Sequence, residues 1–223
     1  MKCFFAILFS TFVLSGVAQT NYTGIYGYTE SRKDLSRRIP GITNDESGYS
    51  SKIIFLRIND NQYRFWLYII KGFPSYNSGQ IEGIIHIQND SAVYYGTDTL
   101  MGTDCVLKFR FSAKEVFIYD QKGGCGFGAN VTAYGRHPKR SSTLPSAADI
   151  AKIGQAEIST YKIKTEKAPI YRDEHAEHAT GQYFTKGDLI YAFDQTEESV
   201  FFQHITKHGK YIEGWIRKKD LRY

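Results

Sequence analysis

The sequence predicts an all-β fold organised as two β-rich units, and three observations carry this prediction. First, 17 Tyr and 15 Phe raise the aromatic fraction to 15%, and large rings pack well on the half-buried surface of a sheet. Second, short stretches of aromatic and β-branched residues alternate with turn residues. Third, no stretch of about 12 residues between positions 21 and 139 follows the helical period. The 42% hydrophobic and 23% charged residues exclude disorder, collagen and coiled coil.

Residues 1–19 have the layout of a secretory signal peptide. Lys2 gives a positive start, an apolar run covers residues 4–14, and small residues occupy 15–18. This run is shorter than the roughly 20 residues that span a bilayer. A buried N-terminal strand is the alternative interpretation. We therefore expect cleavage near Ala18 or Gln19, and a secreted or periplasmic protein without a membrane anchor.

Cleavage would remove Cys3 and leave Cys105 and Cys125 as an even pair. In an exported protein, two such thiols most often form a disulfide. The alternatives are a free catalytic thiol and half of a metal site. A nucleophilic thiol needs a base and a reducing compartment, and zinc needs four ligands, which these cysteines lack at ligand spacing. The spacing therefore favours a disulfide.

Residues 20–140 are expected to form an antiparallel barrel or sandwich. Residues 108–111 alternate charge with ring, as in a strand with one wet face and one buried face. Turn residues follow most of the expected strands, for example Asn59-Asp60-Asn61. The expected strands cover residues 52–58, 63–69, 80–88, 92–95, 106–111, 116–119 and 130–135.

A linker is expected at residues 141–155, with a short helical turn at 146–153, followed by a second β-rich unit at 156–223. Charge divides between the units. Residues 20–140 hold 15 basic and 11 acidic residues, whereas residues 141–223 hold 12 of each. The basic residues cluster only at 136–140, and nucleic-acid binding requires a concentrated stripe with exposed rings. We therefore read the charge as an ordinary solvated surface and expect no nucleic-acid partner.

The second unit contains, in order, Ala168-Pro169-Ile170-Tyr171, a polar loop at 173–180, Lys186-Gly187-Asp188, a hydrophobic strand at 200–205 and Gly214-Trp215-Ile216. This order resembles a bacterial SH3-like (SH3b) domain, over about 60 residues. Gly187 can supply the positive φ of a tight turn, and Asp188 can bond the turn backbone. Trp215 can close a small barrel core. The chain departs from the family pattern in a longer hairpin at 208–211 and in Phe201-Phe202, where Trp-Tyr is usual.

The resemblance implies binding rather than catalysis, because such domains in exported bacterial proteins often dock peptides, commonly those of the cell wall. The family's pocket lies between the long loop and the last hairpin. Tyr171 and Trp215 can alternatively be plain core residues, since rings dominate small cores. The ligand-binding residues that the resemblance implies here are Tyr171, Glu174, Tyr183, Tyr211 and Trp215.

The first unit is similar, without a diagnostic motif, to small secreted antiparallel barrels such as the periplasmic lysozyme inhibitors. The likeness rests on Gly24-Ile25-Tyr26-Gly27-Tyr28, on Ala92-Val93-Tyr94-Tyr95 and on the two cysteine-bearing segments. Lysozymes are generally basic, so an inhibitor should present acidic residues. The excess of basic residues in this unit argues against that target.

Apparent catalytic patterns find little support. The glycines at 123–128 lack the Gly-Lys-Ser/Thr of a phosphate loop and are better explained by a tight turn beside the disulfide. His175 and His178 are metal-ligand types, but they lie in a stretch that we read as a solvated loop. No Gly-x-Ser-x-Gly elbow occurs. We therefore expect no enzyme, cofactor or bound metal.

The sequence thus predicts a secreted binding protein of the bacterial envelope. Its second unit would dock a peptide or cell-wall component, and its first unit another secreted protein or other ligand. One alternative is a carrier whose first barrel encloses a small apolar ligand. Another is a metal-assisted hydrolase acting through His175 and His178.

Overall fold

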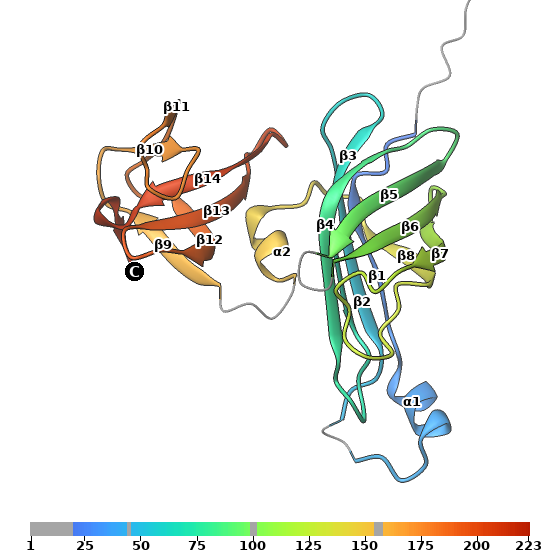
Figure 1. Ribbon diagram of the computed structural model, residues 1–223. Coiled ribbons are helices and arrows are strands. Elements are labelled where there is room, and N and C mark those ends of the chain that lie inside the picture. Colours follow the sequence, from blue (N-terminus) through green and yellow to red (C-terminus); the bar gives the residue numbers. More distant parts are fainter. Residues whose placement is uncertain (1–19, 44–45, 99–101, 154–157) are drawn as a thin grey trace, which may run out of the picture.

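A computed structural model describes residues 20–43, 46–98, 102–153 and 158–223 of the chain. The predicted signal peptide lies outside these residues. Two β units flank a short helix, α2 (Ala147–Ala151), as Figure 1 shows. The fold is all-β, as predicted, with a nearly closed antiparallel barrel in the first unit and a second, smaller sheet.

The first unit is an eight-stranded antiparallel sheet in the order β4-β3-β2-β1-β8-β7-β6-β5. The first and last strands of the unit meet, because β1 pairs with both β2 and β8. The two edge strands, β4 and β5, lie against each other and bring the sheet close to closure. The strands are β1 (Gly24–Thr29), β2 (Ser50–Arg57), β3 (Gln62–Ile70), β4 (Ser78–His86), β5 (Ser91–Asp98), β6 (Thr103–Phe111), β7 (Glu115–Lys122) and β8 (Gly135–Ser141).

Two elements of this unit differ from the prediction. A strand was expected at 130–135, but β8 begins at Gly135 and runs through the basic stretch that precedes the linker. Its pairing with β7 and β1 outweighs the unfavourable strand propensity of Pro138. The helix α1 (Arg32–Arg38) was not predicted, because seven residues with one buried side chain, Leu35, are too short to display a period.

Aromatic rings fill the interior of the barrel. The ring of Phe55 lies 5.2 Å from that of Phe111, 5.6 Å from that of Tyr26 and 6.1 Å from that of Phe109, each in an edge-to-face arrangement. All four side chains are buried. These rings occupy the space that an apolar ligand would need, so the carrier alternative gains no support from the barrel.

The predicted disulfide is present between Cys105 of β6 and Cys125, which follows β7. The glycine-rich segment beside it is a tight turn, as expected. Gly123 has a φ of +80°, and a Cβ at this position would lie 1.6 Å from the carbonyl oxygen of Asp104. Only glycine therefore fits where this turn passes the neighbouring strand.

The helix α2 forms where a helical turn was expected. Its first residue follows Ser146, whose hydroxyl accepts from the Asp149 amide, while the Asp149 carboxylate accepts from the Ser146 amide. This reciprocal capping box stabilises an otherwise very short helix. Ile150 and Ile153 are then buried between the two units.

The second unit is a seven-stranded sheet in the order β11-β10-β14-β13-β12-β9-β15. Its core contains Ile170, Phe184, Ile190, Phe202 and Ile216. The strands are β9 (Ser159–Ile163), β10 (Lys167–Tyr171), β11 (Ala179–Thr185), β12 (Leu189–Gln195), β13 (Ser199–Ile205), β14 (Tyr211–Arg217) and β15 (Leu221–Arg222), with a short 3-10 helix η1 (Lys218–Asp220) before the last.

The turn expected at Lys186-Gly187-Asp188 is confirmed. Gly187 has a φ of +93°, and the Asp188 carboxylate accepts from the Thr185 amide at 2.7 Å and from the Thr185 hydroxyl at 2.9 Å. The side chain thus holds the turn backbone in the way that the sequence suggested.

Within the parts of the chain that the structure describes, no helix has the length and apolar character needed to cross a membrane.

Candidate binding site between the two units

The two units meet through an apolar cluster that is separate from both barrel cores. Residues 53–56 are buried on both faces of β2: Ile53 and Phe55 point into the barrel, whereas Ile54 and Leu56 point outward. A strand buried on both faces shows such a continuous apolar run. Trp66 of β3, Ile150 and Ile153 of the α2 segment and Ile205 of β13 complete the outer cluster.

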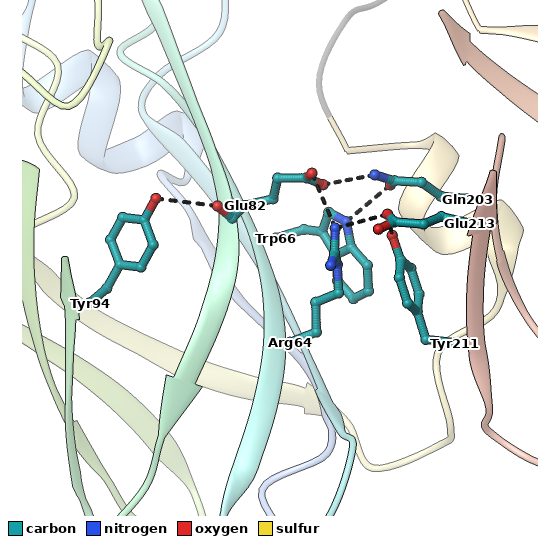
Figure 2. Close-up of polar contacts among 7 residues, drawn as sticks. All are labelled: Arg64, Trp66, Glu82, Tyr94, Gln203, Tyr211 and Glu213. Carbon is teal, nitrogen blue, oxygen red and sulfur yellow. Dashed lines mark hydrogen bonds and ion pairs between the residues drawn. The ribbon is translucent and has the colours of Figure 1, made fainter. Parts of the chain in front are cut away.

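A polar cluster at this junction joins β3 and β4 of the first unit to β14 of the second (Figure 2). The guanidinium of Arg64 donates to the Glu82 carboxylate at 3.2 Å and to the Glu213 carboxylate at 3.1 Å. The same guanidinium lies 4.3 Å from the centre of the Tyr211 ring and 5.6 Å from that of Trp66. An arginine that bonds two carboxylates and stacks on rings is well suited to fix the position of two surfaces.

Gln203 of β13 makes the most buried polar link between the units. Its side-chain oxygen accepts from the indole N–H of Trp66 at 3.1 Å, and its amide nitrogen donates to the Glu82 carboxylate at 3.0 Å. Both halves of the amide are therefore satisfied in a residue that is only 4% exposed.

Tyr211 shows the electrostatic character of this junction. Burial raises the pKa of its phenol strongly, and the hydrogen bond that the phenol donates to the Glu213 carboxylate raises it further. The phenol therefore stays neutral and remains a hydrogen-bond donor. The junction holds Arg64, Glu82, Glu213, Gln203, Trp66 and Tyr211, and we call this set the clamp.

A groove of about 290 Å³ lies beside the clamp. The first unit supplies one wall, the α2 segment the floor, and β12 and β13 the other wall. This volume is near the lower limit for small-ligand pockets. The lining residues are Trp66, Gln80, Glu82, Ile150, Ile153, Phe193, Asp194, Phe201 and Gln203.

A row of aromatic side chains leads across the second sheet to this groove. Tyr171 of β10 pairs with Trp215 of β14, and Trp215 pairs with Phe201 of β13, so their side chains project from the same face. The rings of Trp215 and Phe201 lie 5.4 Å apart. Opposite Phe201 lies Asp194, next to a bulge at Phe193. We call Tyr171, Trp215, Phe201 and Phe193 the aromatic row.

The structure places the five predicted site residues in different surroundings. Tyr171 is buried, with 8% of its surface exposed, next to the half-buried Trp215 in the aromatic row, and Glu174 lies in the turn that follows β10. Tyr183 lies on β11 under the ammonium of Lys167, 4.6 Å from it. Tyr211 belongs to the clamp. The five residues therefore do not form one pocket.

Trp215 was considered both as a ligand-binding residue and as a ring that closes the barrel core. It is half-buried and lies outside the core cluster, because its neighbours on β14, Gly214 and Ile216, are the buried residues and Ile216 belongs to the core. Successive side chains of a strand point to opposite faces of the sheet, so Trp215 faces outward when its two neighbours face the core.

Sequence reasoning missed the residues of the groove, chiefly Trp66, Glu82, Phe193, Phe201 and Gln203. The apolar run at 53–56 was a usable indication, since an outward-facing apolar stripe on a barrel requires a covering partner. Nothing in the sequence identified the second unit's β13 as that partner.

The loop with His175 and His178 is held by Asp173. The Asp173 carboxylate accepts from the amides of Glu177 at 3.1 Å and His178 at 2.9 Å. These bonds lower the pKa of Asp173 to about 2. The His178 ring lies against the same carboxylate, and His175 lies 3.6 Å from Glu174. Over residues 20–43, 46–98, 102–153 and 158–223, no three His, Cys, Asp or Glu side chains converge as a metal site would require.

Comparisons with known proteins find no matching family model, no similar curated sequence and no similar solved structure. The site must therefore be interpreted from its own geometry.

Proposed function

We propose that the protein is an exported binding protein that holds an extended peptide along the aromatic row and in the groove between its units. The observation that carries this proposal is the row of rings on adjacent strands, Tyr171, Trp215 and Phe201, which ends at the carboxylate of Asp194.

The dimensions of the row suit a short peptide. The accessible part of the row lies on three neighbouring strands, β12, β13 and β14, which span about 10 Å at their usual spacing, or about three residues of an extended chain. The half-buried rings of Trp215 and Phe201 offer flat apolar contact, whereas Tyr171 is buried. Such half-buried rings are over-represented where proteins bind one another. The ligand would thus present apolar side chains or methyl groups to Trp215 and Phe201.

The negative charge at the end of the aromatic row indicates that the ligand carries a positive charge there. Asp194 is exposed, and Glu82 lines the opposite wall of the groove. A primary amine or another cationic group entering the groove would meet these carboxylates. A short peptide that carries a free amine, such as a bacterial cell-wall peptide, fits both requirements.

Two further considerations support this assignment. The motif order in residues 168–216 resembles the SH3-like domains that dock cell-wall peptides, and the second unit is a small sheet with the expected Lys-Gly-Asp turn. The disulfide is typical of proteins that leave the reducing cytoplasm, in keeping with the signal peptide proposed at residues 1–19.

Calorimetric titration with a soluble cell-wall peptide tests the proposal. We expect saturable binding to the wild-type chain and a loss of at least about tenfold for Trp215→Ala, because an anchoring ring commonly contributes more than 1.4 kcal/mol. Asp194→Asn should weaken a peptide with a free amine and leave its N-acetylated form unaffected.

Tyr95→Ala is the matched control, since Tyr95 is an exposed ring on β5 of the first unit and is not among the residues that line the groove. The control should bind like the wild type. Binding that is insensitive to Trp215→Ala, or equally sensitive to Tyr95→Ala, would refute the assignment of the site.

A further inference from the structure

The basic stretch 136–140, which looked like ordinary solvated surface in the sequence, becomes strand β8, whose pairing with β1 shifts register between Lys139 and Ser141. Arg136 pairs with Glu115. Lys139 and Arg140 instead line a hollow of about 300 Å³ together with Lys114 from the β6–β7 turn. Ala113, Ser141 and Ser142 complete its lining.

The backbone fixes the relative positions of these cations. The amide of Lys139 donates to the carbonyl of Lys114 at 2.7 Å, which ties the turn to the strand. The Arg140 Nε donates to the carbonyl of Gly27 at 2.9 Å. That bond anchors the guanidinium on β1.

Lys139 is the most constrained of the three. Its ammonium lies 5.4 Å from the centre of the buried Tyr26 ring. Its stem runs so close to the backbone of β1 that a Cβ at Gly24 would lie 2.9 Å from Lys139 Cε. A lysine held in this way cannot swing freely into solvent.

The charges of this hollow are not balanced within the protein. Among the described residues, no carboxylate lies within 4 Å of the Lys114, Lys139 or Arg140 side chains. Burial lowers the pKa of Lys139, and no neighbouring acid compensates for it. An anion bound here would offset the cost of holding three cations together.

We propose that this hollow binds a phosphate group, held by Lys114, Lys139 and Arg140 with the hydroxyls of Ser141 and Ser142 as further donors. The lining residues carry two ammonium groups, a guanidinium and two hydroxyls, and a tetrahedral dianion can accept from more of these donors than a planar carboxylate can. The volume leaves room for part of the molecule that carries the phosphate. The site lies in the first unit and does not depend on the peptide site.

Titration of the full chain with inorganic phosphate at low ionic strength, followed by calorimetry, tests the proposal. We expect saturable binding that weakens at least about tenfold in Arg140→Gln and in Lys114→Gln. Both side chains are exposed, so these variants should fold normally. Lys139→Gln should lose binding as well, with circular dichroism as the check on its fold.

Lys207→Gln is the matched control, because Lys207 is also an exposed lysine next to a hairpin turn but lies in the second unit. Its affinity for phosphate should equal that of the wild type. Acetate and sulfate serve as competing anions. Sulfate is also a tetrahedral dianion and should compete with phosphate, whereas the planar acetate should bind more weakly.

A second binding experiment with vesicles distinguishes a lipid headgroup from a soluble molecule as the source of the phosphate. Binding to phosphatidic acid vesicles that is displaced by free phosphate supports the site and assigns it to a lipid headgroup. Phosphate binding without vesicle binding supports the site and assigns it to a soluble phosphate. Absence of saturable phosphate binding, or an equal loss in Lys207→Gln, would overturn the proposal.

Discussion

At the residue scale, Gln203 and His137 show how much depends on single buried polar groups. Gln203 satisfies Trp66 and Glu82, which are 137 and 121 positions away in the chain. Removing one partner of a buried hydrogen bond leaves the other group desolvated and unpaired. These two side chains are therefore the sensitive points of the clamp and of the barrel, respectively.

Gln203→Ala is expected to lower the free energy of unfolding by about 1–3 kcal/mol, because it leaves the Trp66 indole N–H and one Glu82 oxygen without a partner. Urea unfolding measures this change. Gln182→Ala is the control, since Gln182 is exposed on β11, and it should change stability by less than about 0.5 kcal/mol. Equal effects of the two substitutions would contradict the role of Gln203.

His137 is buried in the barrel, where Nε2 lies 3.1 Å from the carbonyl of Ala133 and Nδ1 lies 2.9 Å from the hydroxyl of Ser51. A carbonyl only accepts, so Nε2 carries the proton and Nδ1 accepts from Ser51. The Ser51 oxygen already accepts from the Tyr28 amide at 3.1 Å. A second proton on the ring would force Ser51 to accept from both Nδ1 and the Tyr28 amide, so its own hydroxyl proton would lose its present acceptor.

Burial lowers the pKa of His137, so the folded state keeps the ring neutral where the unfolded chain would protonate it. Stability is then retained above the unfolded pKa of about 6.5 and falls as the pH drops below it, towards the folded pKa, by up to about 1.4 kcal/mol per pH unit. Unfolding measured at pH 7.5 and 5.5 should show this loss. His137→Gln should reduce it.

The control for this pH dependence is His208→Gln, because His208 is exposed in the β13–β14 turn. It should leave the difference between the two pH values unchanged. A difference that is the same in His137→Gln and the wild type would argue against a neutral buried ring.

The role of a residue could be predicted from the sequence when its partner lies close to it along the chain. Asp188 bonds Thr185 three positions away, and the sequence predicted its role. The pairing of Cys105 with Cys125 was predictable, because these are the two cysteines outside the proposed signal peptide. Gln203 and His137 were not, since their partners are set by strand register. The alternative that Trp215 is a core residue was wrong, because its neighbours on β14 are the buried residues.

At the element scale, turns and short strands were predicted better than the irregular elements. The expected strands at 52–58, 63–69, 80–88, 92–95, 106–111 and 116–119 correspond to β2–β7. The error at β8 arose because the stretch Gly135–Ser141 has no alternation of apolar and polar residues. Its pairing on both sides determines it instead.

Two glycines with nearly the same φ, Gly123 in the turn after β7 and Gly181 in β11, allow the cost of a steric clash to be separated from that of the backbone angle. Gly123 and Gly181 have φ values of +80° and +82°, but a Cβ would clash with Asp104 only at Gly123. Gly123→Ala should therefore lower the free energy of unfolding by about 1–3 kcal/mol more than Gly181→Ala, because the backbone must shift. Thermal unfolding of both variants measures the difference. Equal losses would show that φ alone determines the cost.

At the scale of the whole molecule, the arrangement of the two units is what the sequence does not predict. Outward-facing Ile54 and Leu56 show that β2 needs a cover. Only the fold shows that α2 and β13 supply it and that the clamp then locks the junction (Figure 2). The groove is a consequence of this contact, so no motif within either unit could identify it.

The proposed peptide site lies at the contact between the two units, whereas the proposed phosphate site lies within the first unit. The peptide site requires both units, because Trp66 and Glu82 come from one and Phe193 and Phe201 from the other. The phosphate site requires the first unit only. Arg140→Gln should accordingly leave peptide affinity unchanged, and Trp215→Ala should leave phosphate affinity unchanged.

Hydrogen exchange of the full chain with and without a soluble cell-wall peptide tests the central claim most directly. We predict added protection in β12, β13, β14 and the α2 segment, and none in β5, β6 and β7, because the groove and the aromatic row lie on the former elements. Protection confined to β5–β7, or no change in β13 and β14 at saturating peptide, would contradict the account.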